Sequence, residues 1–324
     1  MRTTRRRRAL PWRTANAECA RAAHELGLLR DELLFHLDSR LGVAERRHLT
    51  HTVHRINALL FLYATLRRAP HDTRLGVLLG TVTHLLDHVY DRPAAGARTG
   101  PLEEVVLGTR VPDPGDVWQS VLGELAARCW TSVADADAVR PYLVRMLATQ
   151  RRSREQMGPS AMEPAALEEL TSDKGHHSLC LYFAAVNAGF GPAEESALRS
   201  FGSYLQYMDD LEDRYEDRAD GRVSPVGPGF RAVREAGRRF AAARRDLADF
   251  YGRGPGARHR MLLAWLTLFH IGVVVGAACE TAERRLPAPV RRTLDRGRRG
   301  LAARVPFFEV APVGAPPQPA GGQS

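Results

Sequence analysis

Six acidic side chains fall within nine consecutive positions, from Asp209 to Asp217, directly after an apolar segment that ends at Met208. On a helix, Asp209, Asp213 and either Glu216 or Asp217 recur at three- and four-residue steps, which aligns their carboxylates along one face. Like charges at that spacing repel one another. A helix that keeps such a row either leaves it in water or neutralises it with a cation, and Mg²⁺ is the usual hard partner of oxygen ligands.

A smaller acid pair lies upstream, where Asp87 and Asp91 are four residues apart at the end of another apolar segment. For either segment alone, a solvated helix face explains the charges equally well. Both acid groups, however, directly follow residues apolar enough to be buried, which places them at the rim of a core. Together they predict a site that holds magnesium and a phosphorylated substrate between two helices. The predicted catalytic carboxylates are Asp87, Asp91, Asp209 and Asp213, and the predicted metal ligands are these four with Glu216 and Asp217.

Composition narrows the class of protein. With 324 residues and 44% hydrophobic content, the chain can bury a large core as one domain or two. Its four cysteines are far apart and lack metal-type spacing, which favours a reducing cytoplasm and buried thiols. The net charge of +9 is carried by arginine, since Lys174 is the only lysine. Such a composition is typical of GC-rich coding bias, so we expect no nucleic-acid partner.

Apolar residues recur at helical steps through most of the chain, and no convincing alternating strand appears. We therefore predict an all-α, single-domain bundle of about ten helices around a central cavity, over residues 15–306. Residues 1–14 are expected to form a flexible basic tail and residues 307–324 a disordered tail rich in Pro and Gly. The long connection Pro93 to Pro114 is interpreted as a mobile flap. The predicted helices are 15–41, 43–68, 74–91, 115–130, 134–156, 164–188, 192–219, 230–252, 257–285 and 289–304.

The segment Met261 to Cys279 is long and apolar enough to span a bilayer. His270 in its middle, arginine-rich flanks on both sides and the lack of a second candidate favour a buried central helix instead. Peripheral membrane association stays open as an alternative, and the sequence leaves the oligomeric state unknown.

An all-helical chain with two acid motifs in this order resembles the class I isoprenoid synthases, and more closely the large-terpene synthases of the tetraprenyl-beta-curcumene synthase type. The first motif of that family runs Asp-Tyr-Leu-Asp-Asn-Leu-Cys-Asp-Arg, and the matching stretch here is His84 to Arg92. Its second motif, Asp-Tyr-x-Ile-Asp-x-x-Glu-Asp, is met by Asp209, Asp213, Glu216 and Asp217. The resemblance implies the isoprenoid synthase fold, three magnesium ions bound with the substrate, and a prenyl diphosphate.

Two positions depart from the family pattern. His84 replaces the leading aspartate of the first motif, and Gly221-Arg222-Val223-Ser224 replaces the Gly-Asp-Leu-Asn that follows the second motif in relatives. Neither change removes Asp87, Asp91, Asp209 or Asp213. Both leave room for an altered substrate or for lost activity.

The expected chemistry suggests further site residues. Basic groups should clamp the diphosphate, and the candidates are Lys174, Arg92, Arg214 and Arg218. Gly175 would let a phosphate approach the backbone closely. His176 and His177 could ligate a metal, but a diphosphate site requires oxygen donors, so zinc is not expected there.

A carbocation must be shielded from water and steadied by aromatic faces. Glycines on the acid faces suggest room for a hydrocarbon tail of about fifteen carbons or more, since glycine is otherwise unfavourable inside helices. The predicted cavity residues are Phe61, Gly76, Gly80, Thr83, His84, Phe183, Gly202, Leu205, Trp265 and Phe269.

The sequence thus predicts a magnesium-dependent terpene synthase that ionises a linear prenyl diphosphate and releases a cyclised or eliminated hydrocarbon. No general acid of the kind used by protonation-initiated cyclases stands out. A trans-prenyltransferase that elongates or joins prenyl chains is the alternative enzyme, disfavoured by the short first motif. A catalytically altered, membrane-associated helical protein is the alternative of another class.

Overall fold

The computed structural model describes residues 11–283 apart from 38, 92–98, 158–161, 220–222, 228 and 253–257. Within that range no side chain is described at 11–16, 44, 157, 215–219, 230, 258 or 279–283. The described residues form helices and connecting turns without a strand, which confirms the all-α prediction. The α-helices are α1 (Pro11–Glu32), α2 (Val43–Arg67), α3 (Thr73–Tyr90), α4 (Thr99–Val106), α5 (Val117–Ser132), α6 (Ala136–Ser153), α7 (Pro164–Asn187), α8 (Pro192–Ala219), α9 (Phe230–Tyr251) and α10 (Arg258–Glu283), and the two 3₁₀ turns are η1 (Leu34–Leu37) and η3 (Arg154–Met157).

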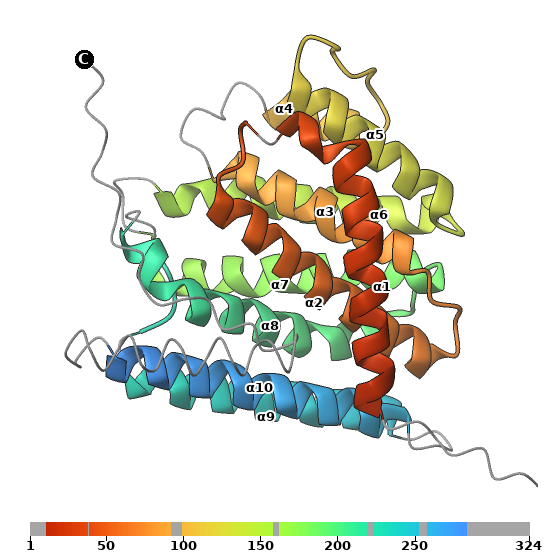
Figure 1. Ribbon diagram of the computed structural model, residues 1–324. Helices are drawn as coiled ribbons and strands as arrows, with labels where there is room; N and C mark the ends of the chain where they lie inside the picture. Colours follow the sequence, from red (N-terminus) through yellow and green to blue (C-terminus); the bar gives the residue numbers. More distant parts are fainter. Residues whose placement is uncertain are drawn as a thin grey trace, which may run out of the picture.

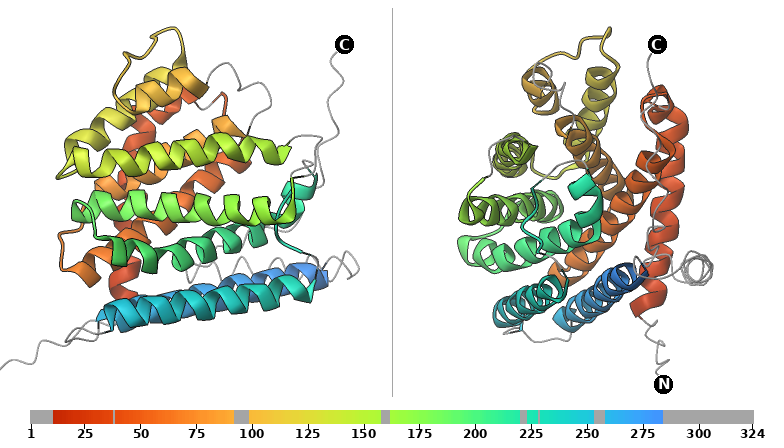
Figure 2. Two further views of the ribbon diagram at one scale, coloured as in Figure 1. Left: turned by 180° about the vertical axis from the view of Figure 1, so that it is seen from behind. Right: turned by 90° about the vertical axis from the view of Figure 1, so that its left-hand side faces the viewer.

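Helices α6, α7, α8 and α9 pack in chain order, each against the next, and α9 in turn packs against α10 (Figure 1). Helix α2 packs on α3, and α10 returns to contact both α2 and α8, which closes the bundle. Helix α1 packs on α2 and α3, and the right-hand view of Figure 2 shows it along one edge of the bundle. The order of neighbours places the ends of α3, α6 and α8 at one end of the bundle.

Aromatic packing fills the interior between α2 and α7. Tyr63 and Phe183 stack with ring centroids 3.6 Å apart, and Phe201 of α8 lies 6.5 Å from Phe183. All three side chains are fully buried. Burial of large aromatic side chains is among the strongest contributions to a core, so this cluster joins three helices tightly.

In the first turn of α8, at the end of the bundle away from the acid motifs, one buried carboxylate is fully matched by donors. Glu194 is only 3% exposed and accepts hydrogen bonds from the hydroxyls of Tyr63, at 2.9 Å, and Tyr251, at 2.6 Å. Arg67 completes an ion pair with it at 3.2 Å. We call these four residues the Glu194 anchor, because they tie α2, α8 and α9 together.

Two predicted segments differ from the structure. The predicted helix 15–41 ends at Glu32 and gives way to η1, whose Leu34 and Leu37 are both buried because a 3₁₀ turn places residues three apart on one side. The predicted flap 93–114 contains α4, whose Leu102, Val105 and Val106 are buried. Helix α4 packs on α5, so the flap interpretation is wrong for residues 99–106. Helix α1 begins at Pro11, inside the predicted tail 1–14.

Helix α10 is not the buried central helix that the sequence suggested. Its segment His259–Ala278 has a mean hydropathy of 2.0, yet only 22% of it is buried. Leu268, Ile271 and Val275 are each about half exposed. Its length and composition alone would allow it to cross a membrane, and among the described residues it is the one such helix. The predicted helix 289–304 and the tail 307–324 lie outside the described residues.

Candidate functional site

The first acid pair, Asp87 and Asp91, lies at the C-terminal end of helix α3. The N-terminus of this helix is capped by Asp72. Asp72 accepts hydrogen bonds from the backbone amides of Arg74 and Leu75, which satisfies the free amides of the first turn. The helix then buries nearly every residue up to its last turn. Asp87 lies in that turn, and the amide of Asp91 bonds to the Asp87 carbonyl at 2.9 Å. The buried part of α3 thus fixes the position of Asp87 and Asp91 at the end of the helix.

Lys174 of α7 is the direct partner of Asp87. Its Nζ lies 2.9 Å from Asp87 Oδ1, and the amide of Gln150 from α6 donates to the same oxygen. Burial by itself would raise the pKa of Asp87, but Lys174 and Gln150 outweigh it and hold the pKa well below its usual range. Asp87 is therefore ionised at any neutral pH.

The second acid group reaches Lys174 as well. Burial would lower the pKa of Lys174, but Asp87 and Asp91 on one side and Asp210 on the other raise it above its usual range. Lys174, the single lysine of the chain, thus lies between carboxylates of α3 and α8. This arrangement brings the two sequence-predicted acid motifs to one place.

Arg55 of α2 is the second cation of the site, and the sequence did not point to it. It forms a two-pronged ion pair with Glu212 of α8, one contact of which measures 3.0 Å. The pKa of Arg55 is raised, because Glu212, Asp209 and Asp213 together outweigh its burial. Arg55 therefore brings positive charge from α2 to the α8 carboxylates.

Asp209 behaves differently from Asp87. The protein around Asp209 raises its pKa, and the negative charge of Glu212 raises it further. His48, Lys174 and Arg55 act to lower it. The Asp209 side chain is exposed to solvent. A divalent cation can therefore reach it and reduce its repulsion from Glu212.

Histidines line the α2 side of the first motif. His84 is 8% exposed, and burial lowers its pKa to about 4, so this side chain is neutral. Its ring centroid lies 5.1 Å from that of His48. His88 pairs with Glu45 at 3.0 Å, which lowers the pKa of that carboxyl. His84 thus places a neutral, buried side chain at this edge of the site.

The comparisons with known proteins address the fold. No family model and no curated protein matches the chain. A solved structure, a geranyltransferase from Legionella pneumophila, superposes with a TM-score of 0.52 at 14% sequence identity. The match covers 82% of this chain and 98% of that one. The chain has an isoprenoid-synthase-type helical fold.

Within this isoprenoid-synthase-type fold, the predicted cavity glycines have another role, and the prediction that they make room for a substrate is wrong. A Cβ on Gly76 would lie 2.4 Å from Asn57 Oδ1, and one on Gly80 would lie 3.1 Å from the Cα of Val53. A Cβ on Gly202 would lie 2.6 Å from the backbone oxygen of Gly175. These glycines let helices approach closely, α2 to α3 and α7 to α8. The same contact excludes a phosphate from Gly175.

The predicted aromatic lining separates into two groups. Phe183 belongs to the packed core and cannot line a cavity, and Phe61 meets His71 edge to face beyond the site. Trp265 and Phe269 of α10 stack at 5.4 Å, and the guanidinium of Arg55 lies 5.8 Å from the Phe269 ring. Only this second pair adjoins the charged residues. Leu205 is partly buried against the core.

The space beside Lys174 is small. Tyr182 of α7 donates a hydrogen bond to Thr83 at 2.9 Å, one turn below Asp87. A cavity of about 20 Å³ adjoins Lys174, with Gln206, Asp210 and Ser224 among its lining residues. That volume holds about one water molecule. A prenyl chain would therefore need more space than this cavity offers.

The remaining basic candidates are not all in place. Arg214 donates to the carbonyls of Leu211, at 2.7 Å, and Ala277, at 2.9 Å, which joins α8 to α10. Arg92 lies outside the described residues, and so do the side chains of Glu216, Asp217 and Arg218. Sequence reasoning missed Arg55, Gln150 and Tyr182. The one available signal was Arg55 itself, a charge inside the apolar stretch from Val53 to Leu62.

Proposed function

We infer that this chain is a magnesium-dependent class I terpene synthase, which ionises a linear prenyl diphosphate and releases a cyclised or eliminated terpene hydrocarbon and pyrophosphate. The observation that supports this most is Lys174, held between Asp87 and Asp91 of α3 and Asp210 of α8. A lysine between two groups of carboxylates can exchange its partners for the oxygens of a diphosphate. The helical likeness to a geranyltransferase agrees with chemistry on prenyl diphosphates.

The donor set suits magnesium. The carboxylates proposed to hold it are Asp87, Asp91, Asp209 and Asp213, all oxygen donors, as hard cations require. The pKa of Asp209 is raised first by the protein around it and then by the negative charge of Glu212, and a bound cation would offset that charge. When bound, magnesium would stabilise the pyrophosphate leaving group as a Lewis acid.

Lys174 and Arg55 would bind and orient the substrate. Lys174 keeps a proton at neutral pH, and its side chain is 18% exposed, so its ammonium group can donate to a diphosphate oxygen. Arg55 is 30% exposed and offers a planar fork suited to phosphate oxygens. In the proposed enzyme, Lys174 and Arg55 each release a carboxylate partner and bind a diphosphate oxygen of the substrate instead.

The hydrocarbon end of the substrate would enter below the carboxylates. Tyr182 and Thr83 close that space, and the stacked rings of Trp265 and Phe269 flank Arg55 nearby. Aromatic faces stabilise a cation within about 6 Å of the ring centroid. We propose that substrate binding breaks the hydrogen bond between Tyr182 and Thr83 and excludes water from the reacting carbon.

Incubation of the purified protein with magnesium and linear prenyl diphosphates of several chain lengths tests this function. The expected products are pyrophosphate and hydrocarbons, both absent when magnesium is removed by a chelator. The proposal is wrong if a folded, magnesium-loaded protein releases pyrophosphate from none of these substrates.

A trans-prenyltransferase is the second candidate, because the solved structure with the same fold is a geranyltransferase. Adding isopentenyl diphosphate to the same incubation separates the two. A terpene synthase gives the same hydrocarbons with or without it, whereas a prenyltransferase gives a longer diphosphate only in its presence.

A further inference from the structure

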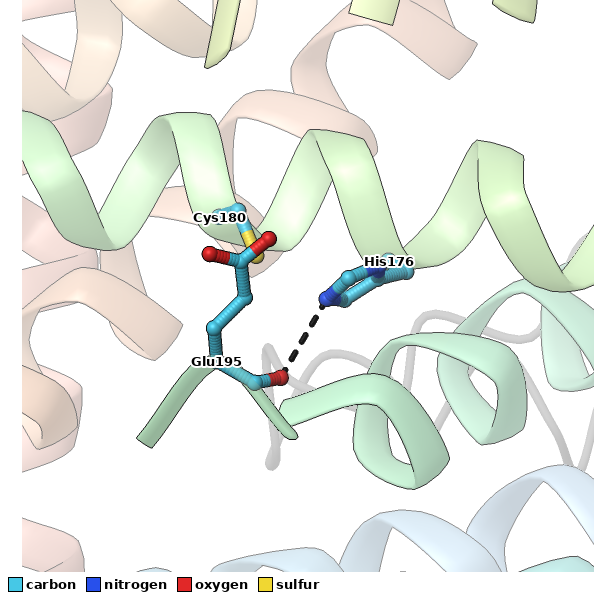
Figure 3. Close-up of side chains that lie close together, drawn as sticks. All are labelled: His176, Cys180 and Glu195. Carbon is cyan, nitrogen blue, oxygen red and sulfur yellow. Dashed lines mark hydrogen bonds between the residues drawn. The ribbon is translucent and has the colours of Figure 1, made fainter. Parts of the chain in front are cut away.

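A second cluster of metal-ligating side chains lies on another side of α7. His176 and Cys180 are four residues apart on this helix, so they share one face. Glu195, in the first turn of α8, faces them (Figure 3). One donor atom from each of the three residues lies within 4.8 Å of the other two. Imidazole, thiol and carboxylate thus converge from two helices.

The two α7 donors have few other tasks in the described structure. His176 is 2% exposed, and its Nδ1 has no hydrogen-bond partner among the described residues. Its Nε2 lies 3.3 Å from the backbone oxygen of Glu195. Cys180 is fully buried and is not in a disulfide. A buried polar atom without a partner destabilises a fold, and a bound ion is one explanation for its presence.

The neighbours of the cluster support a cation site. The Nε2 of His176 faces a carbonyl oxygen, which favours a proton on that nitrogen and leaves the lone pair on the unpartnered Nδ1. Arg145 of α6 donates to Glu195 Oε1 at 2.8 Å and so orients the carboxylate. Groups that hold a ligand in position are a regular feature of metal sites.

This cluster is separate from the magnesium site proposed above. His176 is two residues from Lys174, and two residues of a helix point to nearly opposite sides. Lys174 faces Asp87 of α3, whereas His176 faces the start of α8. The donor types differ as well, because sulfur and nitrogen favour transition metals and carboxylates alone favour magnesium.

We propose that His176, Cys180 and Glu195 form a binding site for Zn²⁺ or a similar transition-metal ion between α7 and α8, with solvent as the fourth ligand. Zinc bonds of about 2.0 to 2.3 Å separate the donors of a tetrahedral site by about 3.5 Å. Donors within 4.8 Å of one another reach that spacing by small side-chain rotations.

Binding is a ligand exchange without oxidation. The S–H bond of Cys180 breaks, a Zn–S bond forms, and the proton passes to solvent. The imidazole of His176 and the carboxylate of Glu195 bind through lone pairs that they already have. The ion links the middle of α7 to the first turn of α8, and this should stabilise the folded chain whether or not the protein acts on prenyl diphosphates.

Cobalt titration of the full-length protein, after treatment with a chelator, tests the site. Cobalt bound to a thiolate gives a sulfur-to-metal charge-transfer band, which the carboxylates at the magnesium site cannot produce. The band should appear at one equivalent of cobalt and disappear when zinc is added. Cys180→Ala should abolish it and weaken zinc binding at least about a hundredfold, more than the loss of a supporting group does.

Cys129→Ala is the matched control, because Cys129 is another buried, unpaired cysteine, on α5. It should leave the band and the zinc affinity unchanged. If Cys180→Ala does not fold, His176→Gln serves instead and should weaken zinc binding by a similar factor. A wild-type protein without the band, or a band that persists in folded Cys180→Ala, would overturn the proposal.

Discussion

The two ends of the bundle hold their carboxylates in different ways. At one end, the carboxylate of Glu194 is 3% exposed and contacts two tyrosine hydroxyls and an arginine. At the other end, several carboxylates of α3 and α8 lie around Lys174 and Arg55. Every contact of the Glu194 anchor lowers the energy of one buried charge. At the acid end, the pKa of Asp209 stays raised although Lys174 and Arg55 act to lower it. The carboxylate of Glu194 has a full set of partners. The acidic group at the other end has more carboxylates than cations, so a further cation would bind there favourably.

The difference separates stability from function. A buried carboxylate that is fully paired destabilises the fold when its charge is removed, because its partners are left without an acceptor. A carboxylate in a crowded acidic group contributes less to stability, since its neighbours repel it. We therefore expect the Glu194 anchor to control unfolding and the acid end to control activity.

The largest expected effect concerns the Glu194 anchor. Glu194→Ala leaves Tyr63, Tyr251 and Arg67 without their shared acceptor, so the free energy of unfolding should fall by about 3–5 kcal/mol in urea denaturation. Glu104→Ala is the control, because Glu104 also pairs with an arginine, Arg110, but at the exposed surface. Its change should stay below about 0.5 kcal/mol. Equal losses in the two variants would show that the anchor does not stabilise the fold.

At the acid end we expect large losses of activity. Asp87→Asn and Asp213→Asn should each reduce the rate with a prenyl diphosphate at least about a hundredfold, roughly 3 kcal/mol in barrier height. Circular dichroism verifies that the variants fold. Asp249→Asn, at an exposed position of α9, serves as the control and should keep full activity. Full activity in Asp87→Asn or Asp213→Asn would remove that residue from the mechanism.

The close helix contacts predict an intermediate effect on stability. Gly202→Ala would place a Cβ 2.6 Å from the Gly175 oxygen and the His176 Cα, so α7 and α8 must separate, at about 1–3 kcal/mol of unfolding free energy. Gly237→Ala, inside α9 with nothing within 4 Å, should instead stabilise the fold by about 0.5–1 kcal/mol. A neutral Gly202→Ala would argue against the close approach of the two helices.

The smallest effect is the pH dependence of the Asp87–Lys174 pair. The folded pKa of Asp87 is lowered, so its contribution is present above the unfolded pKa and lost as pH falls through the folded one. The folded pKa of Lys174 is raised, so its contribution is present below the unfolded pKa and lost as pH rises through the folded one. The stability difference between wild type and Lys174→Met should therefore stay constant from about pH 5 to about pH 9. A steep slope near neutral pH would contradict the ion pair.

The sequence predicted the parts of the molecule that depend on local pattern. Helical periodicity placed α2, α3, α7 and α8 within a few residues of their observed ends. The spacing of Asp87 and Asp209 after apolar runs predicted two acid helix ends, and Lys174 stood out as the only lysine. These features can be read locally, because a helix fixes which residues share a face.

The sequence could not predict what depends on contacts between distant segments. A glycine that admits a substrate and one that admits a neighbouring helix look identical, so Gly76, Gly80 and Gly202 were misinterpreted. The pairing of Arg55 with Glu212 joins residues 157 positions apart and leaves no local mark. Helix α4 was missed because Gly and Pro flank its short apolar stretch.

Calorimetric titration of the protein with magnesium and inorganic pyrophosphate tests the central claim most directly, because it needs neither the right prenyl chain nor turnover. The account predicts that wild type binds pyrophosphate only with magnesium, that Asp87→Asn binds it at least about a hundredfold more weakly, and that Glu194→Gln binds it as wild type does. Binding that is equal in Asp87→Asn and wild type, or no binding to the folded wild type, would contradict the account.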